Sequence, residues 1–374
     1  MQSTDGAIRK RSFTIMNIEK AVYAFRISGQ PISCLNFGHG HINSTFKVTT
    51  DTGREYILQK INKYVFKDPM KVMSNAAAVT NHIRKQVEDP NTVLHIIPTL
   101  RGTYCHRDEE GEFWRMYDFV GGFCLDTPES DEDFYESALA FGAFQRQLAD
   151  FPAETLYETI PEFHNTVDRY RLLKEAIKAD NVGRAAEVQA EINFALGLEA
   201  QCSILQQMRE AGTIPLRITH NDTKLNNVLL NRRTRKWLCV LDLDTVMPGL
   251  SVHDFGDSIR FGAGTAAEDE PDASKMKLDL NKFQVYTRGF LEAATTLTET
   301  EIDNLALGAL TITMETGIRF LKDYLDGDIY FKTAYLEHNL IRARTQFALA
   351  ADMKEKWEQM QQIVREVAKE VHSA

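Results

Sequence analysis

The sequence has few of the features on which secreted, membrane-spanning and nucleic-acid-binding proteins depend. It contains only five cysteines in 374 residues, an odd number, and no two of them form a C-x-x-C pair. This pattern argues against a disulfide framework, a zinc ribbon and a secreted protein. No apolar run approaches the length of about 18 residues that a membrane-spanning helix needs. The formal net charge of −10 argues against a general basic surface for nucleic acid.

Targeting and repeat signals are absent as well. Arg9, Lys10 and Arg11 are not followed by an apolar stretch, so we expect no signal peptide and a cytoplasmic protein. There is no internal repeat and no low-complexity tract. Hydrophobic residues make up 43% and charged residues 26% of the chain, which is ordinary for a soluble globular protein. At roughly 150 residues per domain, the length predicts two or three units or one large two-lobed domain.

The pattern of apolar and polar residues divides the chain into three stretches. Residues 1–30 are expected to form a leader with a short helix. Residues 31–120 carry strand-like alternation and are the predicted N-terminal lobe. Residues 121–374 begin with Gly121-Gly122, are mainly helical in pattern, and are the predicted C-terminal lobe. We therefore expect an α+β protein with two lobes and a ligand cleft between them.

Local turn and cap signals place the elements within these stretches. The leader helix is expected at residues 17–27, and Asp68-Pro69 begins a helix that runs to about Gln86. Three strands of the first lobe, two of them joined by a turn at Asp51-Thr52-Gly53, are expected at residues 44–50, 55–61 and 113–120. Helices of the second lobe are expected at residues 131–149, 166–178, 184–209 and from 275 onward, with a strand–loop–strand insert at 215–244.

The polar loop of that insert is the most informative stretch. A short strand leads into a loop that presents Asp222, and Asn227 follows five residues later. A second, apolar strand ends in Asp242. Two strands that flank a tight loop would bring these three side chains together. Oxygen donors of this kind suit a hard cation, and a carboxylate beside them suits a base for a hydroxyl group, which is the set that phosphoryl transfer needs.

The spacing matches the kinase catalytic loop, H-R-D-x-x-x-x-N followed by a metal-binding aspartate. Here Asn221 replaces the arginine, Asp242-Leu243-Asp244 stands in place of D-F-G, and no A-P-E motif follows. Asp254-Phe255-Gly256 spells the D-F-G tripeptide, but it lies too far along the chain from Asp222 for Asp254 to be the metal-binding aspartate of that motif. The string resembles the aminoglycoside phosphotransferases and choline kinases, which implies their two-lobed, protein-kinase-like fold. Taken singly, these Asp and Asn residues are also typical of turns and caps.

Nucleotide contacts are predicted in the first lobe. Gly38 and Gly40, with Asn43 beside them, would let the backbone approach phosphates, although an ordinary glycine hairpin gives the same pattern. Asp118 and Val120 precede the glycine pair. In two-lobed kinases such a segment lends backbone groups to adenine, and a plain linker is the alternative.

The usual phosphate-binding lysine is missing from the expected strand. Gln59 stands where the pattern calls for it, and Lys60 lies one step away on the other face. The helix that follows holds no Glu or Asp after Pro69. The strand–helix ion pair of typical kinases is therefore absent or rebuilt, and we expect the glycine loop and the metal to hold the phosphates.

Longer strings make a more specific resemblance. From about residue 30 to near the C-terminus, the chain resembles the bacterial N-acetylhexosamine 1-kinases. The strings that carry this resemblance are residues 40–43, 56–59, 219–227, 242–249, 254–262, 314–315, 319–321 and 327–331. One departure is Ala77, at a position where the helix of that family carries an acidic residue.

The resemblance implies ATP-dependent phosphorylation of the anomeric hydroxyl of N-acetylglucosamine or N-acetylgalactosamine, giving the α-sugar-1-phosphate. It implies Asp222 as the base, in contact with the sugar, and Asn227 and Asp242 as ligands of Mg²⁺. Arg319 and Tyr330 match positions that contact the sugar. Residues 31–120 would then be the nucleotide-binding lobe, and residues 121–374 the catalytic and sugar-binding lobe. On chemistry alone, Arg319 in an apolar helix needs a partner, which is either Glu315 or the sugar. Tyr330 either stacks on a sugar or simply packs.

Alternatives to this function stay open on the sequence. One is another kinase of the superfamily, acting on an aminoglycoside, choline or homoserine, and a cationic substrate would call for a site rich in carboxylates. The others are a nucleotide-binding pseudokinase and a purely structural protein. His253, Asp254 and Asp257 are expected to cap a helix or to support the site from outside. Without a coiled coil or an exposed apolar stripe, a monomer is favoured, and the preferred hexosamine and nucleotide stay open.

Overall fold

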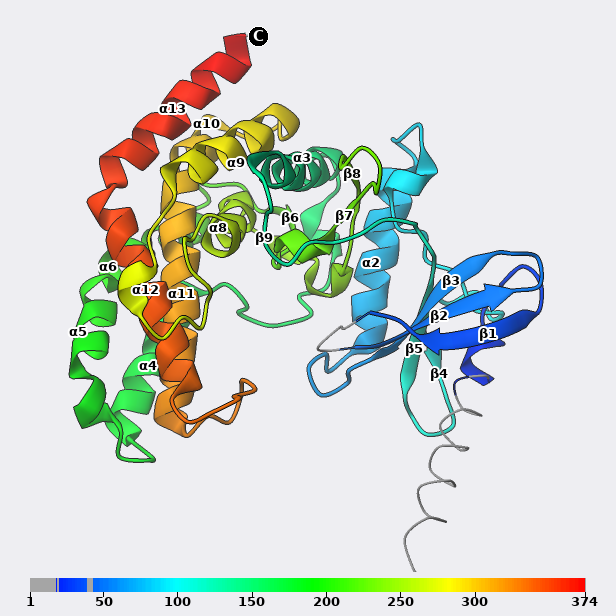
Figure 1. Ribbon diagram of the computed structural model, residues 1–374, viewed down its shortest axis with the longest axis horizontal. Helices are drawn as coiled ribbons and strands as arrows, with labels where there is room; N and C mark the ends of the chain where they lie inside the picture. The colour runs from blue at the N-terminus through cyan, green and yellow to red at the C-terminus, as the bar shows by residue number, and fades with distance from the viewer. Residues whose placement is uncertain (1–17, 19, 39–42, 374) are drawn as a thin grey trace, which may run out of the picture. The chain divides into compact units, whose positions relative to one another are not determined.

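The structure is a computed structural model that describes residue 18 and residues 20–38 and 43–373 (Figure 1). Within this part of the chain, two compact units are present. The first contains the chain up to Gly122 together with Leu156–Ile160 and Leu243–Val246. The second contains Phe123–Thr155, Pro161–Asp242 and Met247–Ala374. Two short segments therefore fold with a unit other than that of their chain neighbours.

An antiparallel sheet forms the framework of the first unit. Among the described residues it has five strands, in the spatial order β1-β2-β3-β5-β4. The strands are β1 (Pro31–Asn36), β2 (Ser44–Thr50), β3 (Glu55–Ile61), β4 (His106–Arg107) and β5 (Phe113–Asp118). The predicted bounds of β2 and β3 are confirmed, and Gly53 makes their turn with a φ of 78°. The third predicted strand ends at Asp118, two residues earlier than expected.

Helix α2 (Pro69–Arg84) confirms the predicted start signals. Asp68 is the N-cap, and its carboxylate accepts a hydrogen bond from the backbone N–H of Lys71 at 3.3 Å. The helix ends two residues before the predicted Gln86.

The predicted helix at residues 17–27 is too long. Its described helical residues end at Val22, and residue 17 lies outside the described part of the chain. Phe25 instead forms a β-bridge with Thr99. Val22 and Phe25 belong to the same buried cluster as Leu58 of the sheet, so burial of these apolar side chains sets the path of the chain.

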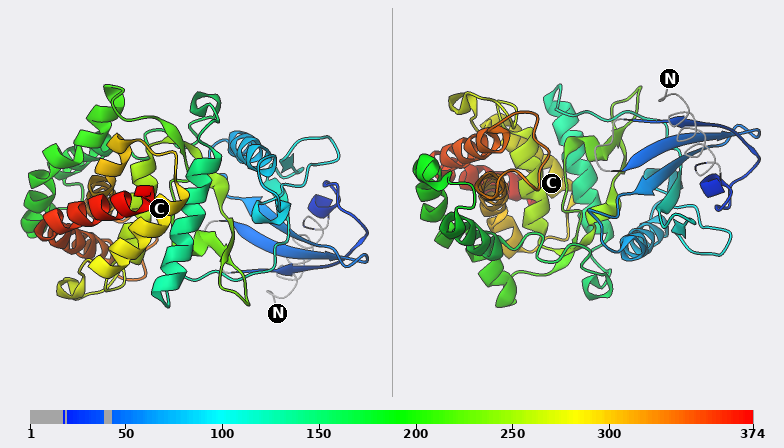
Figure 2. Two further views of the ribbon diagram at one scale, coloured as in Figure 1. Left: turned by 90° about the horizontal axis from the view of Figure 1, so that it is seen from above. Right: turned by 90° about the horizontal axis from the view of Figure 1, so that it is seen from below.

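The second unit is mainly helical, as predicted. Its helices are α3 (Asp131–Gln147), α4 (Thr166–Ala179), α5 (Gln189–Gly197), α6 (Glu199–Cys202), α7 (Ile204–Glu210), α8 (Ser251–Gly262), α9 (Leu280–Ala293), α10 (Glu299–Asp303), α11 (Leu305–Asp326), α12 (His338–Glu355) and α13 (Trp357–Ser373). Helix α11 is almost wholly buried and packs against α4, α8 and α12. Helix α13, red in Figure 2, lies along α9.

Two glycines allow α8 and α11 to pack with their backbones in close contact. A Cβ atom on Gly256 would lie 2.4 Å from the carbonyl oxygen of Gly308, and one on Gly308 would lie 2.1 Å from that of Val252. Any side chain at either position would force the helices apart. These contacts fix the position of α8 along α11, and with it the positions of Asp254 and Asp257, which α8 carries.

The single helix predicted at residues 184–209 is wrong. The segment is broken into a 3₁₀ turn, Ala185–Val188, and the short helices α5, α6 and α7. The apolar spacing that suggested one helix is real, because Val188, Ile192, Ala195, Leu198, Cys202 and Leu205 are all buried in one core. Gly197 ends α5, and glycine is a poor helix former, so the helical period continues without a continuous helix.

The predicted strand–loop–strand insert is more elaborate than expected. Among the described residues of the second unit, it contributes to two separate two-stranded sheets. Strand β6 (Arg217–Thr219) pairs with β9 (Met247–Gly249), and β7 (Val228–Leu230) pairs with β8 (Trp237–Val240). Gly249 is required here, since a Cβ atom on it would lie 2.2 Å from the Thr219 hydroxyl. The loop that carries Asp222 joins the two sheets.

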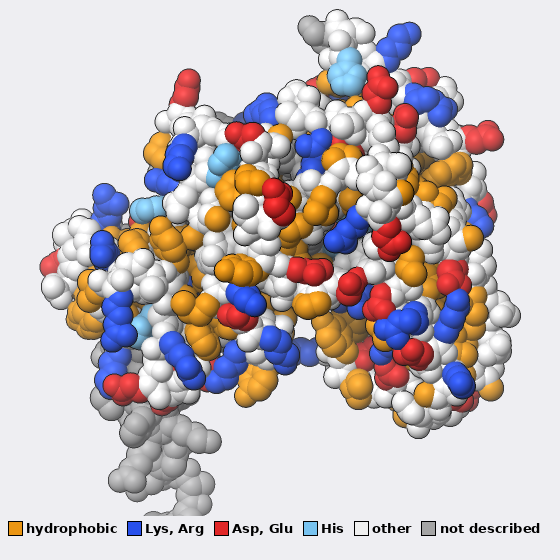
Figure 3. All heavy atoms as spheres, turned by 180° about the vertical axis from the view of Figure 1, so that it is seen from behind, with side chains coloured by type: hydrophobic (Ala, Val, Ile, Leu, Met, Phe, Trp, Pro, Cys, Tyr) orange, Lys and Arg blue, Asp and Glu red, His pale blue; other side chains and the backbone are white. Residues whose placement is uncertain are grey.

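The surface of the protein carries both signs of charge. On the face drawn in Figure 3, basic and acidic side chains are interspersed among apolar ones. None of the helices in the described part of the chain combines the length and apolarity that a bilayer crossing requires.

Candidate active site

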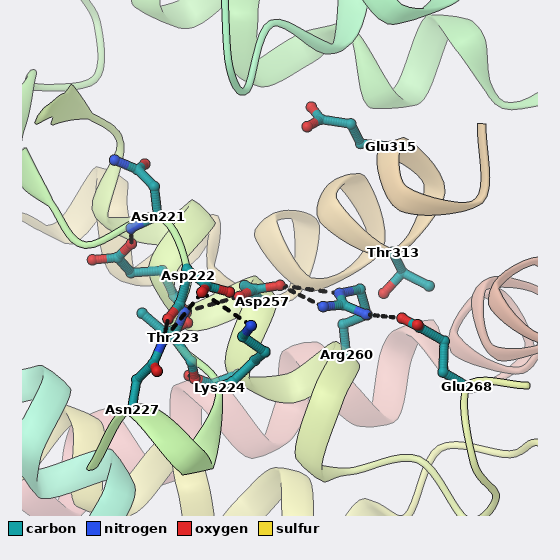
Figure 4. Close-up of polar contacts among 12 residues, drawn as sticks. Asn221, Asp222, Thr223, Lys224, Asn227, Asp257, Arg260, Glu268, Thr313 and Glu315 are labelled. Atoms are coloured by element: carbon teal, nitrogen blue, oxygen red, sulfur yellow. Dashed lines mark hydrogen bonds and ion pairs between the residues drawn. The ribbon is translucent and has the colours of Figure 1, made fainter. Parts of the chain in front are cut away.

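The loop between β6 and β7 brings two predicted site residues together (Figure 4). The Asn227 side-chain amide nitrogen donates to the backbone carbonyl of Asp222 at 2.7 Å and to its carboxylate at 3.1 Å. Asn221 turns the chain just before Asp222 with a φ of 64°, a left-handed conformation that asparagine tolerates better than most residues. The Asp222 side chain is 28% exposed, so a substrate hydroxyl can reach it.

Asp242 is placed beside this loop by its neighbour in the chain. The backbone N–H of Leu241 donates to the carbonyl of Asn227 at 2.7 Å, and the His220 ring donates from Nε2 to the carbonyl of Leu241 at 2.8 Å. Asp242 follows directly, with a φ of 54°. The apolar strand β8 therefore delivers Asp242 to the loop of Asp222 and Asn227.

The donor set of this cluster fits Mg²⁺. The Asn227 amide nitrogen is directed at Asp222, which leaves the amide oxygen to act as a ligand. Among the described residues, no group of three or more His, Cys, Asp and Glu side chains could hold a metal by itself. Mg²⁺ usually binds one or two protein oxygens and completes its shell with phosphate and water, and the Asn227 amide oxygen is a ligand of that kind.

Lys224 is a member of the site that the sequence analysis missed. Its ammonium group lies 3.0 Å from the Asp222 carboxylate (Figure 4). Burial lowers the pKa of Lys224, but the carboxylates of Asp222, Asp257 and Asp242 outweigh it and hold the pKa above its usual value. The lysine is therefore a fixed cation among three acidic side chains. Its position only two residues after Asp222 is the feature of the sequence from which this contact could have been predicted.

Asp254 holds the backbone of the loop that carries Asp222. One carboxylate oxygen accepts from the backbone N–H of His220 at 2.8 Å and from the Gln145 side chain at 2.7 Å. The other accepts from the backbone N–H of Asn221 at 2.8 Å. Burial raises the pKa of Asp254, and these hydrogen bonds oppose that rise. The expectation that Asp254 caps a helix is wrong, because α8 begins at Ser251 and the carboxylate bonds to a distant loop.

Asp257, one turn further along α8, holds the other side of the same loop. Its carboxylate accepts from the backbone N–H of Thr223 at 2.9 Å and pairs with Arg260 at 2.9 Å. Asp254 and Asp257 therefore fix the residues that flank Asp222 on both sides, without occupying the position of the attacking group. They act as supports, which is the second of the two expected roles.

A polar network connects Asn221 to helix α11. The Nε2 atom of His164 lies 3.4 Å from the Asn221 carbonyl, and its Nδ1 atom lies 2.9 Å from Glu315 Oε1. The other oxygen of Glu315 accepts from the Thr166 hydroxyl at 2.8 Å. Glu315 is thus satisfied by His164 and Thr166. The simple pairing of Glu315 with Arg319 is not what the structure contains.

Glu315 should make the protein less stable at acid pH. Burial raises its pKa, but His164, Arg169 and Arg319 outweigh burial and lower it from 4.5 to about 2. Its stabilising contribution is therefore complete above pH 4.5 and is lost as the pH falls toward 2. At 1.36 kcal/mol per pKa unit, this is about 3 kcal/mol. Glu315→Gln should lower the free energy of urea unfolding by about this amount at pH 7 and flatten its decline between pH 4.5 and 3.

The matched control is Glu366→Gln, which removes an exposed carboxylate on α13. This variant should keep the unfolding profile of the unaltered protein. Equal acid sensitivity in the Glu315→Gln variant and the unaltered protein would show that Glu315 does not carry the effect.

Arg319 presents a cation with no carboxylate partner. Its guanidinium lies over the rings of Phe163 and Phe331, at 5.6 and 5.5 Å, and in the described part of the chain it forms no ion pair. Arg169 is nearby: burial lowers the pKa of Arg169, and the charge of Arg319 lowers it further against the opposing effect of Glu315. The Nε atom of Arg169 is buried and has no hydrogen-bond partner among the described residues.

Tyr330 lies on the loop that follows α11. Its side chain is 70% exposed and its ring contacts Phe331 edge-on at 4.8 Å. The loop is fixed by Asp323, whose carboxylate accepts from the backbone N–H groups of Tyr330 and Phe331 at 2.8 and 3.0 Å. Tyr330 and Arg319 are thus joined through Phe331, and an exposed aromatic ring is held next to a free guanidinium.

The residues predicted to contact the nucleotide belong to the first unit. Gly38 turns the chain after β1 with a φ of 73°, and Gly40 lies outside the described residues. The Asn43 amide is directed at Asp244, at 2.8 Å, rather than outward. Asp118 ends β5 and its carboxylate lies 2.6 Å from His95, while Val120 follows in an irregular segment.

Gln59, at the position of the missing lysine, hydrogen-bonds a buried arginine on the neighbouring strand. Gln59 on β3 pairs in register with Arg115 on β5, and its side-chain oxygen accepts from Arg115 Nε at 2.9 Å. Arg115 also binds the Asp244 carboxylate through both terminal nitrogens, one of them at 3.0 Å. Lys60 points to the opposite face of the sheet from Gln59. The sequence flagged Gln59 but missed Arg115 and Asp244.

Solved structures of kinases have the same fold. An amicoumacin kinase, hAmiN, solved with AMP-PNP, Ca²⁺ and Ami, superposes with a TM-score of 0.61 at 12% identity, over 92% of this chain and 95% of that one. A choline kinase from Cryptosporidium parvum Iowa II gives 0.57 at 14% identity, over 96% and 99%. A microcompartment-associated aminopropanol kinase gives 0.58 at 14% identity, over 92% and 98%. At these identities the likeness establishes the fold, which is the protein-kinase-like fold of the aminoglycoside phosphotransferases.

The sequence supplies the family. A model of the phosphotransferase enzyme family matches residues 33–289, which is more than half of the chain. The matched range contains the loop of Asp222 and Asn227, the strand end at Asp242, and the supports Asp254 and Asp257. The chain therefore belongs to the phosphotransferase enzyme family.

Proposed function

We propose that the protein transfers the γ-phosphoryl group of ATP to the anomeric hydroxyl of N-acetylglucosamine or N-acetylgalactosamine, giving the α-sugar-1-phosphate. The observation that carries the phosphotransfer is the pairing of Asp222 with Asn227 on one supported loop, with Asp242 placed beside that loop by the bond between Leu241 and Asn227. Family membership supports the same reaction class. The choice of sugar rests on the resemblance of the longer sequence strings and on the charge of the residues around Arg319.

In this proposal Asp222 accepts the proton of the attacking hydroxyl. The hydroxyl oxygen forms a bond to the γ-phosphorus as the bond to the bridging oxygen of ADP breaks, and no covalent enzyme intermediate is needed. Lys224 lies against Asp222 and holds its carboxylate in one orientation. Positioning and charge compensation dominate reactions of this kind. A loop held by three backbone hydrogen bonds to Asp254 and Asp257 meets that requirement.

Asn227 and Asp242 are the proposed ligands of Mg²⁺, which would neutralise charge on the phosphates when bound. Gly38, Gly40, Asp118 and Val120 remain the proposed nucleotide contacts. The side chain of Asn43 is committed to Asp244, so we assign it a supporting role instead.

The charge near Arg319 argues against a cationic acceptor. Two guanidinium groups, Arg169 and Arg319, lie near Glu315, whose oxygens are already taken by His164 and Thr166. The other carboxylate that acts on Arg169 belongs to Asp168, which is paired with Arg171. An aminoglycoside or choline would meet uncompensated positive charge here. A neutral sugar with hydroxyl and acetamido oxygens offers acceptors to these donors, and exposed Tyr330 offers a ring for its apolar face. These features favour a neutral, oxygen-rich acceptor.

An acceptor panel tests the proposed function. The purified protein is incubated with Mg-ATP and either N-acetylglucosamine, N-acetylgalactosamine, glucose, kanamycin, choline or homoserine, and ADP release is followed. We expect turnover with the two N-acetylhexosamines to exceed that with the cationic acceptors by at least 100-fold in kcat/KM. Turnover of kanamycin or choline alone would keep the phosphotransfer and overturn the substrate. Absence of turnover with every acceptor would contradict the proposal.

Arg319→Met should weaken binding of the sugar and leave the chemical step nearly intact. The change removes the charged donor that lies over the rings of Phe163 and Phe331 and keeps an unbranched apolar side chain at the position. A hydrogen bond to a charged group contributes about 1.5–3 kcal/mol, so KM for the sugar should rise by roughly 10- to 150-fold. Steady-state kinetics would measure KM for the sugar, KM for ATP and kcat separately.

Arg344→Met is the matched control, because this arginine lies on α12 and pairs with Glu191. It should leave all three kinetic constants within about twofold of the unaltered protein, as expected for a surface substitution. An unchanged KM for the sugar in the Arg319→Met variant would rule out contact between Arg319 and the acceptor.

A further inference from the structure

The segment Leu243–Val246 is anchored in the first unit, although the chain on either side belongs to the second. Leu243 and Val246 are buried, and the segment forms a 3₁₀ turn, Leu243–Thr245. The Asn75 side chain of α2 donates to the carbonyl of Val246 at 3.0 Å. Asp244 in the middle of the turn is held by Arg115. The residue that precedes this anchored segment is Asp242, the proposed metal ligand.

Arg115 and Asp244 form a fully buried ion pair. Their side chains are 1% and 3% exposed, and both terminal nitrogens of the guanidinium bind the carboxylate. The third nitrogen, Nε, donates to Gln59, whose amide donates in turn to the Thr45 hydroxyl at 3.0 Å. A buried pair persists only when its remaining hydrogen-bonding groups are satisfied, and this one meets that condition.

Asn43 connects the same pair to the chain that follows the predicted glycine loop. Its side-chain nitrogen donates to Asp244 Oδ2 at 2.8 Å, and its side-chain oxygen accepts from the backbone N–H of Asn62 at 2.9 Å. Asn43 is also the first described residue after the predicted phosphate-binding glycines. Asp244 thus joins three parts of the first unit: the start of β2, the strand β5 and the turn after Asp242.

We infer that Arg115 is a positioning residue for the metal ligand Asp242, acting through Asp244, and this inference rests on the proposed function. Asp242 is fixed from both directions along the chain. Leu241 before it is held by Asn227 and His220, and Asp244 after it is held by Arg115 and Asn43. With Gln59 in the lysine position and no acidic residue in α2, the pair of Arg115 and Asp244 provides the buried cation–carboxylate link of this unit.

The inference predicts a defect in the use of Mg-ATP that is separate from stability. In the double variant Arg115→Met with Asp244→Leu, both charges are removed together, so no unpaired charge is left buried and the protein should stay folded. Its half-saturating Mg²⁺ concentration should rise at least 10-fold and its kcat/KM for ATP should fall at least 10-fold. KM for the acceptor should stay within about twofold. Isothermal titration with Mg-AMP-PNP, without acceptor, should show at least a 10-fold weaker Kd.

Three further variants complete the test. Asn43→Ala removes the link to β2 without burying a charge, and it should raise the half-saturating Mg²⁺ concentration by roughly threefold or more. Asp242→Ala removes the ligand itself and sets the upper limit of the defect. The matched control is Lys63→Met with Glu112→Leu, which removes an ion pair of the same unit that makes no bond to the turn after Asp242. It should leave Mg²⁺ dependence unchanged.

The outcomes separate the inference from the proposed function. Unaltered Mg²⁺ dependence and Mg-AMP-PNP affinity in a folded double variant, or in Asn43→Ala if the double variant does not fold, would overturn the positioning role. An equal rise in KM for the acceptor and KM for ATP would also overturn the positioning role, because such a rise would indicate general damage to the protein. Failure of the unaltered protein to bind Mg-AMP-PNP would overturn the proposed function and the positioning role with it.

Discussion

Asp222→Asn should lower kcat by about 10²- to 10⁴-fold, which is the usual contribution of a positioned general base. Asparagine keeps the size of the side chain and an oxygen that can accept from Asn227, but it cannot take up the proton of the attacking hydroxyl. KM for ATP should change little, because the proposed metal ligands are Asn227 and Asp242. Steady-state kinetics at saturating ATP and sugar would measure the effect.

The control is Asp126→Asn, since the exposed Asp126 carboxylate hydrogen-bonds the same loop through Asn226 at 3.3 Å but lies outside the cluster. This variant should retain the activity of the unaltered protein. If Asp222→Asn kept more than about a tenth of the original kcat, the assignment of Asp222 as the base would be wrong.

Asp254→Ala should have the largest combined effect on stability and activity. The change leaves two buried backbone N–H groups, of His220 and Asn221, without their acceptor. Each unpaired buried group costs about 1–3 kcal/mol, so loss of the acceptor for two of them should lower the free energy of unfolding by about 2–6 kcal/mol. In the fraction that stays folded, the loop loses its anchor next to Asp222, and kcat should fall by at least 10-fold. Urea unfolding and steady-state kinetics measure the two effects separately.

Gln145→Ala provides the comparison, because it removes the side-chain donor to the same carboxylate and leaves both backbone bonds in place. We expect a loss of about 1 kcal/mol and nearly full activity from this variant. Comparable losses in the two variants would mean that the backbone bonds to Asp254 do not hold the loop.

Local signals made much of the fold predictable. The bounds of β2 and β3 and the start of α2 followed from alternation, a glycine turn and an aspartate–proline cap, all of which act between neighbouring residues. The broken helix at residues 184–209 shows where this reasoning stops. The regular spacing of apolar residues in this segment arises because they are buried in one core. Burial at this spacing does not require an unbroken hydrogen-bonded helix.

The predictable part of the site was the part confined to one loop and the strand that follows it. Asp222, Asn227 and Asp242 lie on such a stretch, and their spacing alone predicted that they would meet. Asp254 supports the same loop from 34 residues further along, on a helix whose depth is set by Gly256 and Gly308. Sequence spacing carries no information on that packing, so a helix cap was an equally good explanation.

The first unit shows the same limit in its sheet. Gln59 marked the absence of a lysine, because the strand pattern gives the face on which that lysine would lie. Arg115, the cation that binds Gln59, lies on β5, which pairs with β3 across a long connection. Its carboxylate partner, Asp244, comes from a segment far along the chain. Neither pairing follows from local propensity, and only the register of the sheet reveals it.

The most direct test of the proposed function is proton and phosphorus NMR of a reaction that contains the purified protein, Mg-ATP and N-acetylglucosamine or N-acetylgalactosamine. We expect an anomeric proton coupled to phosphorus, with the small proton–proton coupling of an α-linkage, and the appearance of ADP. Unchanged sugar with intact ATP would contradict the proposed function. Phosphate on C6 would retain the catalytic role of Asp222 and contradict the proposed placement of the sugar.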